Sequence, residues 1–168
     1  MVIKYVGKLS LKYKIYNMIT IEDFKIKHSN KVRFIGLDLG SKRIGVSICD
    51  ERQSIATPFK TINKTNTRNL VEELKKIIEE NNIEGIIIGN PVNMDGSAGR
   101  SAQSVNDVAT NISKSINLPV ILWDERLSTV GAFNLSSLLD INVSKRVKTI
   151  DKNAAAFILQ GAIDYLNN

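Results

Sequence analysis

Four acidic residues, spread over most of the chain, have the types and settings needed for metal-assisted chemistry. Asp38 lies near the end of the apolar segment 32–39, where a buried carboxylate would require a partner or a metal ion. Asp124 and Glu125 directly follow the apolar segment 119–123, and Asp151 stands at the expected start of the last helix. If these carboxylates converge, cations must neutralise them, and ligand sets made only of oxygen favour Mg²⁺ or Mn²⁺ over zinc. Two such ions about 4 Å apart would hold the attacking and leaving oxygens of a phosphodiester in line.

Each acid also has a simpler explanation when it is taken alone. Aspartate at the start of a helix is a common N-cap, which would account for Asp151. Acids just after a strand are often solvated turn residues, which would account for Asp124 and Glu125. Asp38 is harder to explain in this way, because the residues on both sides of it are apolar.

Basic residues that could hold a polyanionic substrate occur in the same segments as the acids. Any single one of them is equally well explained as ordinary surface charge. The candidates for substrate binding are Lys42, Arg43, Arg100, Arg126, Lys145, Arg146 and Lys148.

Other chemistries lack the residues that they need. The chain of 168 residues has one histidine, His28 beside Lys27, which gives little support to a histidine metal site or a catalytic triad. The lone Cys49 excludes an intramolecular disulfide and a cysteine zinc cluster, and it is expected to be a small buried hydrophobe. Glycine-rich phosphate-binding loops are absent. The longest apolar run has six residues, against the roughly 18 of a membrane span.

The elements that must position the acids follow an α/β pattern. A hairpin of strands comes first, and strands then alternate with helices, which predicts a mixed sheet with helices on its faces. The predicted strands are 32–39, 45–49, 58–62, 85–90 and 119–123, and the predicted helices are 67–81, 101–116, 128–139 and 151–166. The segment 91–99 is expected to be a mobile loop, and 140–150 a basic loop.

Most of the net charge of +6 comes from the N-terminal segment. Residues 1–31 hold seven lysines against two acids, whereas residues 32–168 are nearly neutral. We expect two parts: residues 1–31 as a poorly ordered basic extension, and residues 32–168 as the folded domain. The extension is interpreted either as an arm that contacts polyanions or as sequence upstream of a true start near Met18.

Four motifs, in order, resemble the YqgF/RuvX family of Holliday-junction-resolvase-like proteins in the RNase H-like superfamily. The resemblance covers about residues 32–166. The motifs are FIGLDLGSKRIGVS at 34–47, GNPVNMDGS at 89–97, WDERLST at 123–129 and DKNAA at 151–155.

The resemblance implies a five-stranded sheet in the order 3-2-1-4-5 and a divalent-metal nuclease that trims the 5′ end of the 16S ribosomal RNA precursor in the bacterial cytoplasm. It implies that Asp38 is the central metal ligand, Glu125 or its neighbour Asp124 the second, and Asp151 the third. One departure is that Asn90-Pro91 stands where many members of the superfamily place an acid. Asp95 could also contribute, although a loop flanked by glycine positions a ligand poorly.

Two other functions remain open, and a third is disfavoured by the length of the chain. A four-way DNA junction could replace RNA as the substrate. A stable dimer would favour the DNA junction, whereas the monomer or weak homodimer that we expect would count against it. A non-catalytic module bound to RNA or to a pre-ribosomal particle would bind nucleic acid without metal. The opening hairpin is also typical of actin-like ATPases, but those need two related domains, for which 168 residues are too few.

Overall fold

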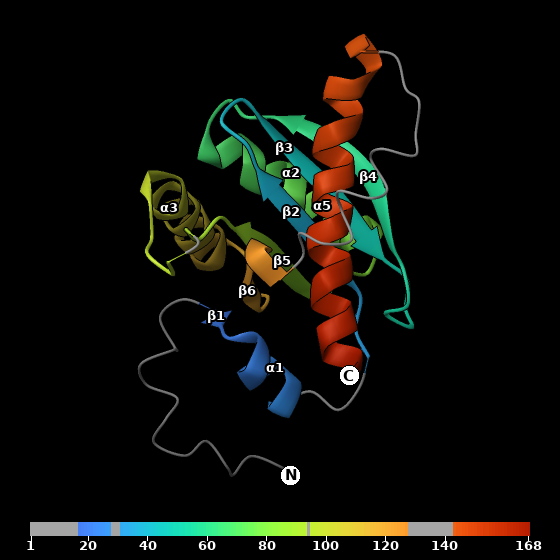
Figure 1. Ribbon diagram of the computed structural model, residues 1–168. Helices are drawn as coiled ribbons and strands as arrows, with labels where there is room; N and C mark the ends of the chain where they lie inside the picture. The colour runs from blue at the N-terminus through green and yellow to red at the C-terminus, as the bar shows by residue number, and fades with distance from the viewer. Residues whose placement is uncertain (1–16, 28–30, 94, 128–142) are drawn as a thin grey trace.

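The computed structural model describes residues 17–27, 31–93, 95–127 and 143–168, with side chains from Asn153 onward in the last range. Its centre is a six-stranded mixed sheet in the order β1-β6-β5-β2-β3-β4 (Figure 1). β2 pairs with β3, and β3 with β4, in antiparallel fashion, and the remaining neighbours are parallel. The strands are β1 (Met18–Ile19), β2 (Phe34–Leu39), β3 (Arg43–Cys49), β4 (Ala56–Asn63), β5 (Gly85–Asn90) and β6 (Val120–Asp124).

The predicted mixed α/β fold is confirmed, with a correction to the strand count. The five expected strands occur in the implied order, and β1 adds a sixth at the edge beside β6. β1 comes from the segment that we expected to be a poorly ordered extension. The short helix α1 (Ile21–Lys27) follows it and buries Ile21 and Phe24, so residues 18–27 pack onto the domain.

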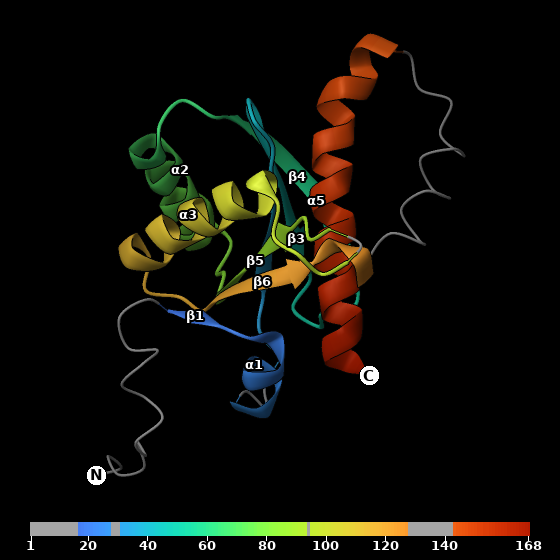
Figure 2. The same cartoon turned by 60° about the vertical axis from the view of Figure 1, so that its left-hand side comes forward.

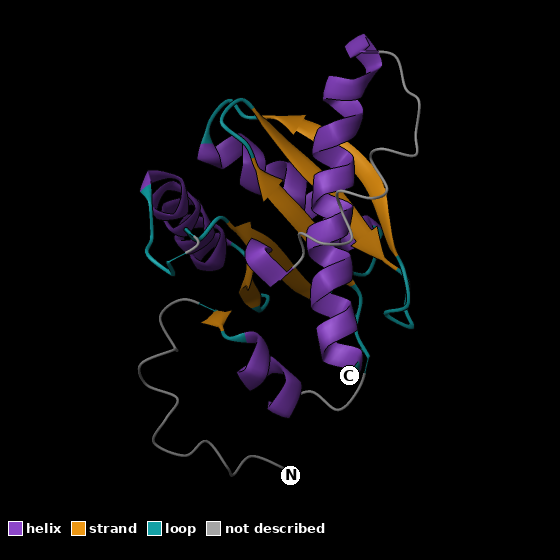
Figure 3. Ribbon diagram, in the orientation of Figure 1, coloured by secondary structure: helices purple, strands orange, loops and turns teal. Residues whose placement is uncertain are grey.

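Helices cover both faces of the sheet (Figures 2 and 3). Side chains alternate between the faces of a strand. In β2, Ile35 and Leu37 therefore join a core with α2 (Thr67–Glu80) and α3 (Arg100–Ser115), whereas Phe34 packs with Leu159 and Ile163 of α5 (Val143–Asn167). Both helices on the first face were predicted, because their apolar residues recur at helical spacing. None of the helices that the structure describes is long and apolar enough to span a membrane.

The last helix begins earlier than predicted. We expected a basic loop at 140–150 and a helix start at Asp151, but α5 begins at Val143. Neither proline nor glycine stands between Val143 and Asp151, so nothing in the sequence breaks the helix there. Lys145, Arg146 and Lys148 therefore lie on α5, and Asp151 lies within the helix and is not its N-cap. The predicted helix 128–139 and His28 fall outside the described residues.

α5 crosses the sheet at a position where β2 has no side chain. A Cβ built on Gly36 would lie 2.7 Å from Leu159 Cβ and 3.0 Å from the Ala155 carbonyl oxygen. The hydroxyl of the buried Ser47 on β3 donates to that same carbonyl at 2.8 Å. This close approach fixes α5 against the strand that carries Asp38.

Candidate active site

Three neighbouring parallel strands end at the same edge of the sheet. Leu37 of β2 is opposite Ile88 of β5, and Gly89 of β5 is opposite Trp123 of β6. Asp38, Gly89 and the segment after Trp123 therefore lie at one level. Ligands of parallel α/β sheets gather at this carboxyl edge.

Asp38 belongs to the face of the sheet that α5 covers. It stands two residues after Gly36, the residue that meets Ala155 and Leu159, so the alternation of β2 places both residues on that face. Asp38 is half-buried, which is less than the full burial that the apolar residues around it predicted.

The carboxylate of Glu125 lies over the backbone of Gly89. Glu125 opens the single turn η1 (Glu125–Leu127) that follows β6. A Cβ built on Gly89 would lie 2.5 Å from Glu125 Oε1 and equally close to Ile158 Cδ1 of α5. The missing side chain of Gly89 thus provides the room that Glu125 occupies. Sequence reasoning missed this role, although an isolated glycine in a buried strand signals a close approach.

Glu125 and Asp38 are electrostatic neighbours. Burial raises the pKa of the Glu125 carboxyl above its ordinary value of 4.5, and the negative charges of Asp38 and then Asp124 raise it further. The charge of Asp38 on β2 therefore acts on a carboxyl group of η1, which follows a different strand.

Asp124 has a different environment from Glu125. In β6, Trp123 packs on the α5 side, so Asp124 projects to the opposite face. Its carboxylate is held by Arg126, whose Nε lies 3.0 Å from both oxygens and whose Nη2 lies 2.5 Å from Oδ2. These hydrogen bonds hold the pKa of Asp124 below its usual range. The two adjacent acids, which the sequence could not separate, are thus distinct in the structure.

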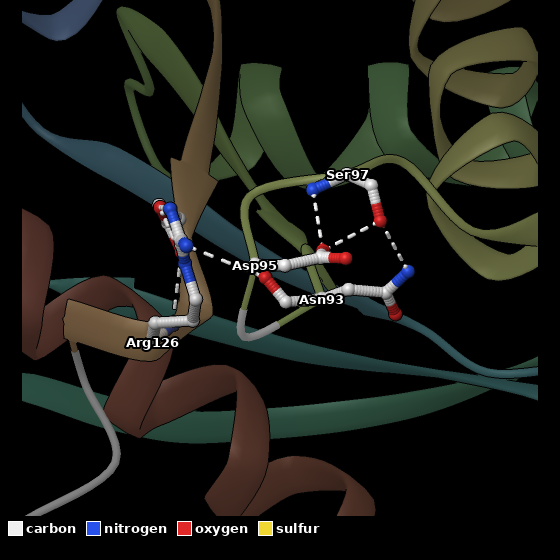
Figure 4. Close-up of polar contacts among 5 residues, drawn as sticks. Asn93, Asp95, Ser97 and Arg126 are labelled. Carbon is white, nitrogen blue, oxygen red and sulfur yellow. Dashed lines mark hydrogen bonds and ion pairs between the residues drawn. The ribbon is translucent and has the colours of Figure 1, made fainter.

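The loop between β5 and α3 is ordered by its own polar side chains (Figure 4). The carboxylate of Asp95 accepts hydrogen bonds from the backbone N–H of Ser97 at 2.9 Å and from its hydroxyl at 2.6 Å. These bonds lower the pKa of Asp95. The side-chain amide of Asn93 lies 2.9 Å from the Ser97 hydroxyl oxygen. The carboxylate of Asp95 therefore stabilises its own loop. Its charge is not among the causes that raise the pKa of Glu125.

Asn90 ends β5, at the position where the resemblance to the superfamily would place an acid. Its Oδ1 is buried and has no hydrogen-bond partner among the described residues. Strand alternation places Asn90 with Ile88, on the face away from Asp38. Asn90 therefore does not replace a carboxylate on the face that carries Asp38.

The position of Asp151 in the fold follows only from the course of α5. Ser47 contacts Ala155, and Asn167 near the end of α5 donates to the carbonyl of Gln53 beyond β3, so α5 runs along β3 and against β2. Asp151 lies one turn before Ala155, towards the end of β2 that carries Asp38. The side chains of Asp151, Lys145, Arg146 and Lys148 lie outside the described part.

The remaining predicted cations flank this edge. Lys42 is exposed and Arg43 half-buried after β2, and Arg100 is exposed at the start of α3. The guanidinium of Arg126 is bound to Asp124.

The donor atoms at the edge fit a hard divalent cation. Asp38 and Glu125 offer carboxylate oxygens, which Mg²⁺ and Mn²⁺ prefer. Within the described side chains, no three histidine, cysteine or acidic residues group closely enough to hold a metal ion.

The raised pKa of Glu125 predicts how stability depends on pH in the metal-free protein. Because the folded state binds this proton more tightly than the unfolded state, ionisation of Glu125 destabilises the fold as the pH rises from about 4.5 through the raised pKa. We expect Glu125→Gln to have a higher unfolding midpoint than the wild type at pH 8 in EDTA, and the difference to vanish below pH 4.5. Urea unfolding at several pH values measures it. If Glu125→Gln remained equally more stable than the wild type below pH 4.5, ionisation of Glu125 would not be the cause of the difference.

Comparisons with known proteins place the chain among nucleases. The family model described as "RuvX: Holliday junction resolvase" matches residues 32–165. A relative from Pelagibacter ubique (strain HTCC1062) is 89% identical over 151 residues, covering 90% of this chain and all of the relative. One from Rhodobacter capsulatus is 42% identical, covering 87% of this chain and 92% of the relative. Both are named "Putative pre-16S rRNA nuclease".

Two solved structures share the fold at low sequence identity. Thermus thermophilus RuvC in complex with a Holliday junction has a TM-score of 0.50 at 10% identity, covering 76% of this chain and 91% of that chain. The yeast mitochondrial Holliday junction resolvase Ydc2 has a TM-score of 0.50 at 14% identity, with coverages of 88% and 84%. The fold is therefore that of the RuvC-like resolvases.

Proposed function

The chain belongs to the RuvX family of Holliday junction resolvases, and from that premise we propose that it is a divalent-metal-dependent nuclease that processes the 5′ end of pre-16S ribosomal RNA. The observation that carries the proposal is the pair of carboxylates, Asp38 and Glu125, brought together at the carboxyl edge of three parallel strands. The names of the 89% and 42% identical relatives support RNA as the substrate.

The proposed ligands are Asp38, Glu125 and Asp151. Asp38 is proposed as the central ligand, because it lies near the end of β2, which stands between β5 and β3 in the sheet, on the face that α5 covers. Glu125 is preferred to Asp124 as the second ligand, since Asp124 projects to the other face and is bound to Arg126. Asp151 is the third, on the argument that α5 carries it towards the end of β2.

The residues around these carboxylates would bind and orient the substrate. A bound Mg²⁺ or Mn²⁺ would polarise the phosphodiester and make water a better nucleophile. Lys42, Arg43 and Arg100 are proposed to hold phosphates that flank the cleaved bond, since they lie on segments beside the same edge. Lys145, Arg146 and Lys148 would do so from the first turns of α5.

Cleavage assays with two substrates test the proposal. Purified protein is incubated with Mg²⁺ or Mn²⁺ and either a 16S precursor fragment extended at its 5′ end or a four-way DNA junction, with EDTA as the metal-free control. We expect cleavage of the RNA that EDTA abolishes. Junction cleavage without RNA cleavage would establish the second candidate, a DNA resolvase, which the description of the matching family favours.

A third result would make the chain a binding module. In that case, RNA or pre-ribosomal particles would bind equally well with and without EDTA, and neither substrate would be cut. The mass of the protein in solution, measured alongside, distinguishes a monomer or weak homodimer from the stable dimer that a junction resolvase would require.

A further inference from the structure

Two charged residues of opposite sign flank the proposed ligand Glu125 in the chain. Asp124 ends β6 and Arg126 lies in η1, so Glu125 stands between them. Besides the side-chain ion pair, the backbone N–H of Arg126 donates to Asp124 Oδ1 at 3.0 Å. The turn that carries Glu125 is therefore closed by a carboxylate that contacts both the backbone and the side chain of Arg126.

Arg126 also joins this turn to the loop between β5 and α3 (Figure 4). Its Nη1 donates to the carbonyl oxygen of Asn93 at 3.3 Å. A Cβ built on Gly96, which has a positive φ of 83°, would lie 3.8 Å from the same nitrogen. Each of the three guanidinium nitrogens thus donates to a protein oxygen, and the loop packs against the arginine.

This geometry differs from what a phosphate-binding arginine needs. Such a residue presents its planar fork to the substrate. Here the fork, made of Nε and Nη2, is turned to Asp124, whose side chain is 27% exposed. Binding a phosphate through that fork would require breaking the ion pair and leaving a partly buried carboxylate beside the substrate.

We propose that Asp124 and Arg126 act as one positioning unit, which holds the Glu125 turn against the loop 93–97 and thereby sets the Glu125 carboxylate over Gly89, and that neither residue contacts metal or substrate. The inference deepens the proposed function and rests on it. It replaces the sequence-based prediction of Asp124 as a catalytic residue and Arg126 as a substrate-binding residue.

The signs of the two charges make the proposal testable. If the two charges affected the metal only through space, loss of the negative charge in Asp124→Asn would weaken Mn²⁺ binding, and loss of the positive charge in Arg126→Gln would strengthen it. If the two residues act as a positioning unit, both substitutions should weaken Mn²⁺ binding. Arg126→Lys keeps the charge but loses the fork, so it should behave like Arg126→Gln.

The experiment measures Mn²⁺ affinity, RNA affinity in EDTA and the salt dependence of RNA binding. It uses these variants and the double variant Asp124→Asn/Arg126→Gln. We expect all of them to bind Mn²⁺ about tenfold or more weakly, the usual effect of losing a residue that orients a ligand. We expect the double variant to be no worse than either single one, since both remove the same unit. In EDTA, the affinity for the 5′-extended RNA and its salt dependence should stay within about twofold of the wild type. Glu73→Gln breaks the Lys60–Glu73 pair elsewhere on the surface and is the matched control.

Other outcomes would overturn the proposal in identifiable ways. Weaker RNA binding and a shallower salt dependence in Arg126→Gln, with tighter binding in Asp124→Asn, would make Arg126 a phosphate ligand. If the two single substitutions changed Mn²⁺ affinity in opposite directions, or if their losses of affinity added up in the double variant, the residues would not form a positioning unit.

Hydrogen exchange of the amides of 93–97 needs neither metal nor RNA. It should be faster in both single variants and unchanged in Glu73→Gln, and unchanged exchange in the single variants would refute the link to the loop. If the wild type and Asp38→Asn bind Mn²⁺ equally, the proposed metal site fails, while the exchange result still decides whether the link exists.

Discussion

Asp38→Asn is expected to reduce the cleavage rate by about a thousandfold or more while leaving the fold intact. The amide has the size of the carboxylate but lacks the charge that a divalent ion requires, and a lost metal removes several kcal/mol of transition-state stabilisation. The variant should be at least as stable as the wild type at neutral pH, because it removes a negative charge that raises the pKa of the Glu125 carboxyl. Single-turnover cleavage and urea unfolding measure the two effects.

The control for this prediction is Asp107→Asn, which removes an exposed acid from α3. It changes the net charge by the same amount and should cleave at the wild-type rate. Equal rates for Asp38→Asn and the wild type would refute the assignment of Asp38. A large loss in the control as well would indicate that overall charge, and not the site, controls the rate.

The sheet was predictable from sequence because its signals are local. Apolar runs such as Gly85–Asn90 and the apolar spacing of 67–81 identify strand and helix without knowledge of the rest of the chain. β1 was missed since it contains two residues, and its place depends on pairing with β6, more than a hundred positions later. The start of α5 was missed because an aspartate that resembles an N-cap outweighed the absence of a helix breaker before it.

The site was predictable only in part, for a related reason. Asp38 stood out because a charge within an apolar strand needs a compensating contact. The choice between Asp124 and Glu125 depends on which face of the sheet each reaches and on a guanidinium that binds one of them. Neighbouring positions carry no such information in the sequence, since both are acids after the same strand.

Gly89→Ala is the sharpest test of how the fold builds the site. The added methyl group would overlap Glu125 Oε1 and Ile158 Cδ1, which are ends of flexible side chains and can move. We therefore expect a loss of about 1 kcal/mol in stability, at the low end for overpacking. Displacing the Glu125 carboxylate by about 1 Å, enough to relieve this overlap, should nevertheless lower cleavage about a hundredfold, because errors of that size at a reacting centre have such effects.

Two further variants separate displacement of Glu125 from damage to the strand. Gly99→Ala adds a methyl group at the N-cap of α3, where the nearest atom, on Asn93, is 3.4 Å away and φ is −75°, so it should cleave normally. Glu125→Asp shortens the side chain by one methylene and withdraws the carboxylate from Gly89. If Gly89 acts only by leaving room for Glu125, Gly89→Ala should cost little further activity in the Glu125→Asp background. A full hundredfold loss there would show that the methyl group acts on something other than Glu125, and Gly89 would then have a different role from the one that the structure indicates.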